Sequence, residues 1–197
     1  MERGHAEALA PLLDELMRDV AGGFATLERI AVTVGPGSFT GIRIGLATAR
    51  AMGLALSIPV VGVSTLVAFA APFLVEPGQG VIASAIDARH GRVYLQLFEP
   101  MGRPLLPPRI EGLREAVRAI GASPVRLAGS GARLLALEAG RIGLVAELAE
   151  NCDFPDIVAV ALLGLAAEPR NSPPRPSYLK PPDAQPAVGD GVARVNR

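Results

Sequence analysis

The predicted secondary structure of the second half of the chain repeats that of the first half and adds three strands in front of it. In the second half, the residue patterns predict three strands and then helix, strand, helix, strand, helix at 81–87, 92–99, 104–110, 112–120, 125–128, 132–140, 141–145 and 155–168. In the first half they predict helix, strand, helix, strand, helix at 2–21, 29–34, about 38–57, 59–63 and 65–74. A near repeat on this scale indicates two lobes of related topology.

Two lobes of this element order resemble the duplicated pattern of the actin, Hsp70 and sugar-kinase (ASKHA) superfamily. We therefore predict an α/β fold with a truncated first lobe at 1–76, a second lobe at 77–168 and a proline-rich, partly flexible segment at 169–197, in which Tyr178 and Leu179 pack locally. Two strands alone seldom form a stable sheet. We expect either that about 30 to 40 residues precede Met1, by analogy with the second lobe, or that a partner covers the open sheet edge.

The composition excludes several classes of protein. The 19 basic and 19 acidic residues give a formal net charge of zero, which argues against a domain that holds nucleic acid by charge alone. The single cysteine, Cys152, excludes an intramolecular disulfide framework and, with only two histidines, a structural zinc site of four Cys/His ligands. Lys180 is the only lysine, so the body of the chain offers none for a P-loop or a Schiff base.

An uncharged stretch between Arg50 and Glu76 is long enough to cross a bilayer of about 30 Å. Pro59 and Gly62 interrupt it, and the pattern predicts helix, strand and helix rather than a membrane span. The N-terminal helix carries acidic residues in place of the basic n-region of an export signal. We therefore expect a cytoplasmic protein.

Three glycines lie in the turn Gly35–Gly41, between a predicted strand and a predicted helix. Such a turn can present backbone N–H groups to an anion, or it can simply need a glycine at positive φ. The spacing fits neither the Walker loop nor the Rossmann fingerprint, and Pro36 and Thr40 replace the glycines of a nucleophile elbow around Ser38. A triad of Ser38, His90 and Asp87 can be drawn, but a histidine in a hairpin turn is usually a solvated residue. The tight-turn interpretation is favoured.

Small residues recur every fourth position along the second helix, at Gly41, Gly45, Ala49 and Gly53. Each helical glycine costs roughly 1 kcal/mol relative to alanine, so a close neighbour is expected on this face. That neighbour is either the chain's own sheet or first helix, or a helix of another subunit that contributes leucines like those at 9–20. Arg43 and Arg50, seven residues apart on the same helix, are expected to be solvated rather than to contact phosphate.

Four stretches resemble, in the same order, the bacterial TsaB (YeaZ) family of tRNA threonylcarbamoyladenosine biosynthesis proteins. The longest is Val32–Leu46 (VTVGPGSFTGIRIGL), and the others are Arg3–Glu7, Ile86–Tyr94 and Tyr178–Ala184. Family members open with a strand-rich segment that this chain lacks, which agrees with the truncation inferred from the repeat.

The resemblance implies a non-catalytic subunit that pairs with TsaD and works with the ATPase TsaE. In this reaction a threonylcarbamoyl group is transferred to the adenosine 3′ of the anticodon in tRNAs that read ANN codons. No cofactor or metal is expected on this chain, tRNA is expected to be contacted only through the complex, and a homodimer is possible.

The resemblance also implies a partner surface made by the first two helices. Carried over to this chain, the partner-facing candidates are Leu9, Leu12, Leu13, Leu16, Ile42, Gly45, Leu46 and Ala49. The alternative hypothesis is a stand-alone enzyme, either a peptidase-like or a nucleotide hydrolase, that uses the Gly35–Gly41 turn.

Overall fold

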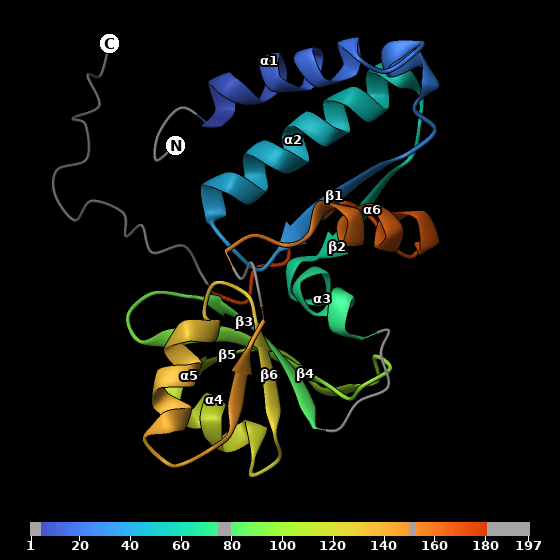
Figure 1. The fold of residues 1–197 in the computed structure, drawn as a ribbon. Coiled ribbons are helices and arrows are strands. Elements are labelled where there is room, and N and C mark those ends of the chain that lie inside the picture. The colour runs from blue at the N-terminus through green and yellow to red at the C-terminus, as the bar shows by residue number, and fades with distance from the viewer. Residues whose placement is uncertain (1–4, 75–79, 150–152, 181–197) are drawn as a thin grey trace, which may run out of the picture.

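Two separate β-sheets form the framework of the computed structural model, which describes residues 5–74, 80–149 and 153–180 (Figure 1). The first sheet pairs β1 (Ile30–Gly35) with β2 (Val60–Ser64) in parallel. The second has the order β5-β4-β3-β6-β7, with bounds Pro104–Gly112, Arg92–Phe98, Val81–Asp87, Val125–Ala128 and Ala146–Leu148. Its β3–β4 and β4–β5 pairs are antiparallel and its β3–β6 and β6–β7 pairs are parallel. The predicted α/β class is confirmed.

The second lobe holds the largest core. Helices α4 (Leu113–Ile120) and α5 (Ala132–Gly140) pack on the sheet, and the buried residues between them include Leu95, Leu127 and Leu135. The short helix α3 (Thr65–Ala70) and the 3-10 turn η2 (Ala71–Phe73) follow β2 in the chain, yet Leu66 and Phe69 of α3 pack on Ile86 and Ala128 of the second sheet. Helix α3 therefore joins the two lobes.

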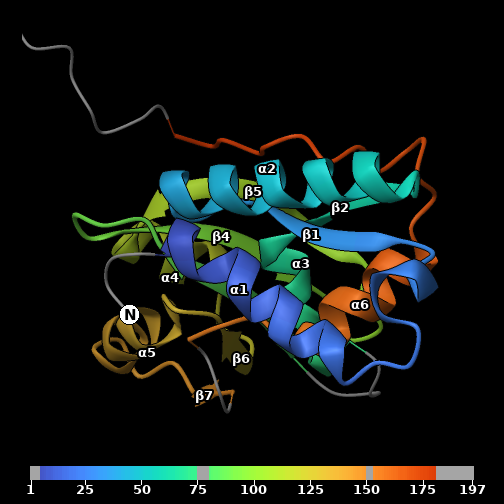
Figure 2. The ribbon, with the colours of Figure 1, turned by 90° about the horizontal axis from the view of Figure 1, so that it is seen from above.

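Helix α2 (Phe39–Leu56) packs on β1, and α1 (His5–Arg18) lies alongside α2 (Figures 1 and 2). A short 3-10 turn, η1 (Gly23–Thr26), connects α1 to β1. A Cβ built on Gly45 would lie 3.7 Å from Val32 Cγ2, and one built on Gly53 would lie 2.3 Å from Val60 Cγ2. The small residues of α2 thus face the chain's own sheet, as the simpler of the two interpretations predicted.

Helix α6 (Ile157–Ala166) packs on β1 and β2, although its position in the chain predicted that it belongs to the second lobe. A Cβ built on Gly164 would lie only 2.3 Å from Ala31 Cβ, so the two backbones approach closely. The Arg29 guanidinium donates hydrogen bonds of 2.8–3.0 Å to the carbonyls of Gly164, Leu165 and Ala167. These bonds satisfy carbonyl groups at the C-terminal end of α6 that have no partner within the helix.

Strand β7 begins five residues later than predicted. Leu144 N–H donates a hydrogen bond to the Ala139 carbonyl, and Gly143 adopts φ 72°. This glycine-dependent ending of α5 occupies the residues up to Leu144, so the strand begins only after them. The uncharged stretch after Arg50 divides into the end of α2, β2 and α3, as predicted. In the part of the chain that the structure describes, no helix combines the length and hydropathy that crossing a bilayer requires.

Residues 172–180, called the strap below, run along α2 on the side opposite α1 (Figure 2). Gly62 N–H donates to the Ser172 carbonyl at 2.9 Å, and Ser177 N–H donates to the Val34 carbonyl at 2.8 Å. Tyr178 was expected to pack locally, and the structure shows that the strap as a whole is docked on the first lobe. The end of the predicted flexible segment, 181–197, lies outside the described residues.

Candidate functional site

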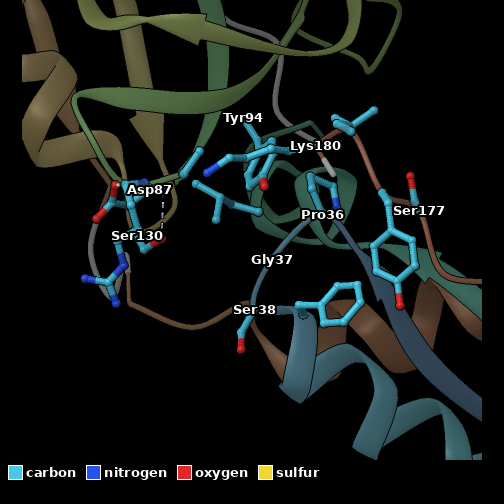
Figure 3. A pocket seen from close by; sticks show the side chains of 14 residues that line it. Pro36, Gly37, Ser38, Asp87, Tyr94, Ser130, Ser177 and Lys180 are labelled. Atoms are coloured by element: carbon cyan, nitrogen blue, oxygen red, sulfur yellow. Dashed lines mark hydrogen bonds between the residues drawn. The ribbon is translucent and has the colours of Figure 1, made fainter. Parts of the chain in front are cut away.

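A cavity of about 460 Å³ lies where the two lobes and the strap meet (Figure 3). The Pro36–Phe39 turn forms one wall, the β3–β4 hairpin with Ser130 forms another, and Ser177–Lys180 form a third. In Figure 3, Asp87 and Ser130 lie on one side of the cavity and Ser177 on the other. Its volume is in the range typical of small-molecule pockets, roughly 300–1,000 Å³.

The glycine turn is built for a close approach of the backbone. The Gly35–Pro36 peptide bond is cis, and Gly35 adopts φ 105°, which side-chain-bearing residues rarely adopt. A Cβ on Gly35 would lie 2.8 Å from Ile42 Cδ1 and 2.9 Å from the Ser177 carbonyl oxygen. The expectation of a tight turn that needs glycine is confirmed at this position.

Ser38 acts as the N-cap of α2, because its hydroxyl accepts a hydrogen bond from Gly41 N–H at 3.3 Å. Asp87 and Ser38 both line the cavity, whereas His90 is exposed and is not among the lining residues. The Asp87 carboxylate accepts a hydrogen bond from Arg89 N–H at 2.8 Å. The structure therefore does not assemble the Ser38–His90–Asp87 triad.

The hairpin that carries Asp87 turns through three consecutive residues of positive φ, Arg89 (65°), His90 (54°) and Gly91 (69°). The strands predicted at 81–87 and 92–99 placed a hairpin turn between them, which the structure confirms. Ser130 Oγ accepts a hydrogen bond from Asp87 N–H at 3.3 Å and fixes the base of the hairpin. Asp87 and Arg89 thus both belong to one wall of the cavity.

Polar residues of several types are among those that line the cavity. Those with hydroxyl groups are Ser38, Tyr94, Ser130, Ser177 and Tyr178, and those with charged groups are Asp87, Arg89 and Lys180. Within the described residues no group of three or more His, Cys, Asp or Glu side chains is close enough to hold a metal ion.

The predicted partner surface is divided between exposed and buried residues. Leu12 and Leu16 of α1 are 52% and 65% exposed. Leu9 and Leu13 are half-buried. On α2, Gly45 is half-buried, and the fully buried candidates are Ile42, Leu46 and Ala49. These three do not face outward because this side of α2 covers the chain's own sheet, so that part of the expected surface needs correction.

The arginines on the outer side of α2 hold the strap. Arg50 donates a hydrogen bond to the Pro174 carbonyl. Arg43 Nε donates to Tyr178 Oη at 3.3 Å, and its guanidinium carbon lies 3.8 Å from the centre of the Phe39 ring. Both arginines are exposed, as expected, and groups of the strap also give them hydrogen-bond partners that no residue pattern indicated.

The two lobes, with the cavity between them, define an α/β protein of the ASKHA class. The family model of TsaD, tRNA N6-adenosine threonylcarbamoyltransferase, matches residues 1–121, more than half of the sequence. The chain therefore belongs to this family, and within it to the TsaB (YeaZ) group, as the resemblance predicted.

Similar proteins include the tRNA threonylcarbamoyladenosine biosynthesis protein TsaB of Escherichia coli K12, which is 35% identical over 92 residues, 47% of this chain and 40% of the relative. TsaB of Bacillus subtilis is 34% identical over 99 residues, 50% of this chain and 42% of the relative. The solved structure of YeaZ from Pseudomonas aeruginosa aligns with a TM-score of 0.66 and 26% identity, over 90% of this chain and 85% of that one. The matched stretch spans only about two fifths of the length of these curated relatives.

Proposed function

We propose that this chain is a subunit of the machinery that makes threonylcarbamoyladenosine in tRNA. The names of its relatives and its match to the transferase family support this proposal. Its role would be that of a partner to a TsaD-type transferase, which carries out the transfer of the threonylcarbamoyl group to the adenosine 3′ of the anticodon in ANN-decoding tRNAs. The use of the Ser38 hydroxyl as a helix cap supports a non-catalytic role over that of a stand-alone hydrolase.

The observation that carries the proposal is an apolar stripe on the outer face of α1. Leu12, Leu16 and Val20 follow one another at intervals of four residues and are 52%, 65% and 41% exposed. Leu12 and Leu16 lie on one face of the helix, where they can fit a groove of a second helix, and Val20 follows in the turn after it. Leu9 and Leu13 of the same helix are half-buried, so each can add part of its side-chain surface to the contact.

The partner surface proposed here is therefore narrower than the one expected from the resemblance. It consists of the outer face of α1 and excludes the buried positions of α2. The strap occupies the opposite side of α2, so a partner that binds the two helices would approach from the α1 side (Figure 2).

Light scattering on a size-exclusion column tests the proposal, with this chain mixed with the TsaD-type protein of the same organism. We expect a one-to-one complex, and we expect Leu16→Asp to weaken it by at least about tenfold, since a buried charge without a partner is costly at an interface. Leu137→Asp is the matched control, because Leu137 is 71% exposed on α5 in the other lobe. A complex that both variants weaken equally, or no complex with the wild-type chain, would overturn the proposal.

The remaining expectations about partners stay predictions. A homodimer would use the same stripe and would be detected when the chain is run alone. Contact with TsaE, tRNA contact only through the complex and a cytoplasmic location each await a direct measurement.

A further inference from the structure

The strap is attached to the first lobe at several points along its length. Two backbone hydrogen bonds, from Gly62 to Ser172 and from Ser177 to Val34, fix its start and its middle. Between them, Arg50 of α2 bonds to the Pro174 carbonyl. At the end of the strap, the Tyr178 ring stacks on Phe39 with 4.9 Å between ring centres. The end of the strap is thus attached where α2 begins.

Two glycines of the first sheet leave room for the strap. A Cβ on Gly35 would lie 2.9 Å from the Ser177 carbonyl oxygen, and a Cβ on Gly62 would lie 2.9 Å from the Pro173 carbonyl oxygen. At Gly62 the backbone angle is not one that needs glycine, so a side chain is disfavoured there by lack of space, which Val34 Cγ1 at 2.5 Å and the strap's Pro173 carbonyl both take. The contact with the strap is therefore built into both strands of the sheet.

The end of the strap also forms one wall of the cavity. Ser177, Tyr178, Leu179 and Lys180 all line it, opposite the hairpin that carries Asp87. Movement of these residues away from α2 would remove that wall. Access to the hairpin side of the cavity thus depends on whether the strap is docked.

No residue of the strap is fully buried, and the side chains that attach it by hydrogen bonds are exposed. Arg43 and Arg50 are exposed, and Tyr178 is 42% exposed. Pro173, Pro174 and Pro176 have no N–H group, so this part of the strap cannot pair with β2 as a regular strand. Segments with few buried contacts and solvent-exposed hydrogen bonds open locally, without unfolding of the domain.

We propose that the strap is a latch, which closes the cavity when Arg43, Arg50 and Phe39 hold it and opens the cavity when it leaves α2. Opening also releases both arginines and uncovers the outer edge of β2 at Gly62. The latch does not depend on the function proposed above, because its contacts lie on the side of α2 away from the proposed partner surface.

Hydrogen exchange of two backbone amides tests whether the strap opens locally. Gly62 and Ser177 donate the hydrogen bonds that are lost on opening, so we expect their amides to exchange together and at least about tenfold faster than amides in the middle of β3. Arg50→Ala should accelerate both by about two- to tenfold, the usual range for one hydrogen bond. Arg133→Ala, at an exposed arginine of α5, should change neither. Exchange of both amides as slow as that of β3 would show that the strap is a fixed part of the fold and would overturn the proposal.

Thiol labelling tests whether the strap controls access to the cavity. Ala88 lines the cavity and is only 5% exposed, so Ala88→Cys in a Cys152→Ser background reports entry of a bulky maleimide. We expect Arg50→Ala to increase the labelling rate by about the same factor as the amide exchange, and Arg133→Ala to leave it unchanged. If Arg50→Ala accelerates the exchange of the two amides but leaves the labelling rate unchanged, the strap does not control access to the cavity and the proposal is overturned.

Discussion

Glu99 and Arg103 flank the turn between β4 and β5, where Arg103 Nε donates to the Glu99 carboxylate at 2.7 Å and Nη2 donates to its other oxygen. These hydrogen bonds, aided by charge attraction and opposed by desolvation, lower the pKa of Glu99 below its ordinary value of 4.5. A lowered pKa means that the pair stabilises the fold above the unfolded-state pKa and that this contribution is lost as the pH falls through the folded-state pKa. We expect an NMR titration of the Glu99 carboxyl to give a midpoint below 4.5, and Arg103→Gln to restore the ordinary value.

The effect of this pair on overall stability should be small, because the Arg103 side chain is 74% exposed. The free energy of unfolding of wild type should therefore exceed that of Arg103→Gln only slightly above about pH 5, and this difference should disappear as the pH falls through the folded-state pKa of Glu99. A Glu99 midpoint that is the same in both proteins would contradict the assigned cause of the shift.

Among single residues, the sequence predicted best those whose role is local. Gly35 lies in the turn that was expected to need a glycine at positive φ, an expectation that depends only on immediate neighbours. Arg43 and Arg50 could not be assigned, since their partners lie more than 120 residues further along the chain. The positive φ of Arg89 also carried no signal, because arginine does not favour that conformation.

At the level of whole elements, α6 is the least predictable because nearly all its residues are apolar. A helix that is hydrophobic on every side has no periodic face that would indicate which sheet it covers. Its docking instead depends on one small residue, Gly164, opposite Ala31. The strap escaped prediction for a related reason, since its two sheet contacts are made by backbone groups that no residue pattern marks.

Substitution of Gly164 tests the docking of α6 on the first sheet. Gly164→Ala should destabilise the protein by about 1–3 kcal/mol, because the added Cβ would overlap Ala31. Gly140→Ala is the matched control, since Gly140 ends α5 and a Cβ there meets nothing within 4 Å. In a helix with free space the same substitution should be neutral or stabilise by up to about 1 kcal/mol. Urea unfolding measures both, and a Gly164→Ala variant as stable as Gly140→Ala would show that α6 does not pack as described.

For the molecule as a whole, the repeat of element order predicted the class and the two lobes, and the five-stranded sheet follows it. The connections between the lobes were not predictable in the same way. Helix α3 packs on the second sheet, helix α6 and the strap return to the first lobe, and the strap forms one wall of the cavity. Local patterns identify elements, whereas these contacts depend on which apolar faces and backbone groups remain unpaired after each lobe has formed.

Two apolar surfaces compete as the contact site for a partner, the stripe on α1 and the outer side of α6, where Ile157, Leu162 and Leu165 are 60–77% exposed. Hydrogen exchange by mass spectrometry, on this chain alone and saturated with the TsaD-type protein of its organism, separates them directly. We predict that the bound transferase slows exchange in peptides covering Leu12–Val20 and leaves peptides of α6 and of the strap unchanged. Protection of α6 without protection of α1, or no protection in the presence of excess partner, would contradict the assignment of α1 as the pairing surface.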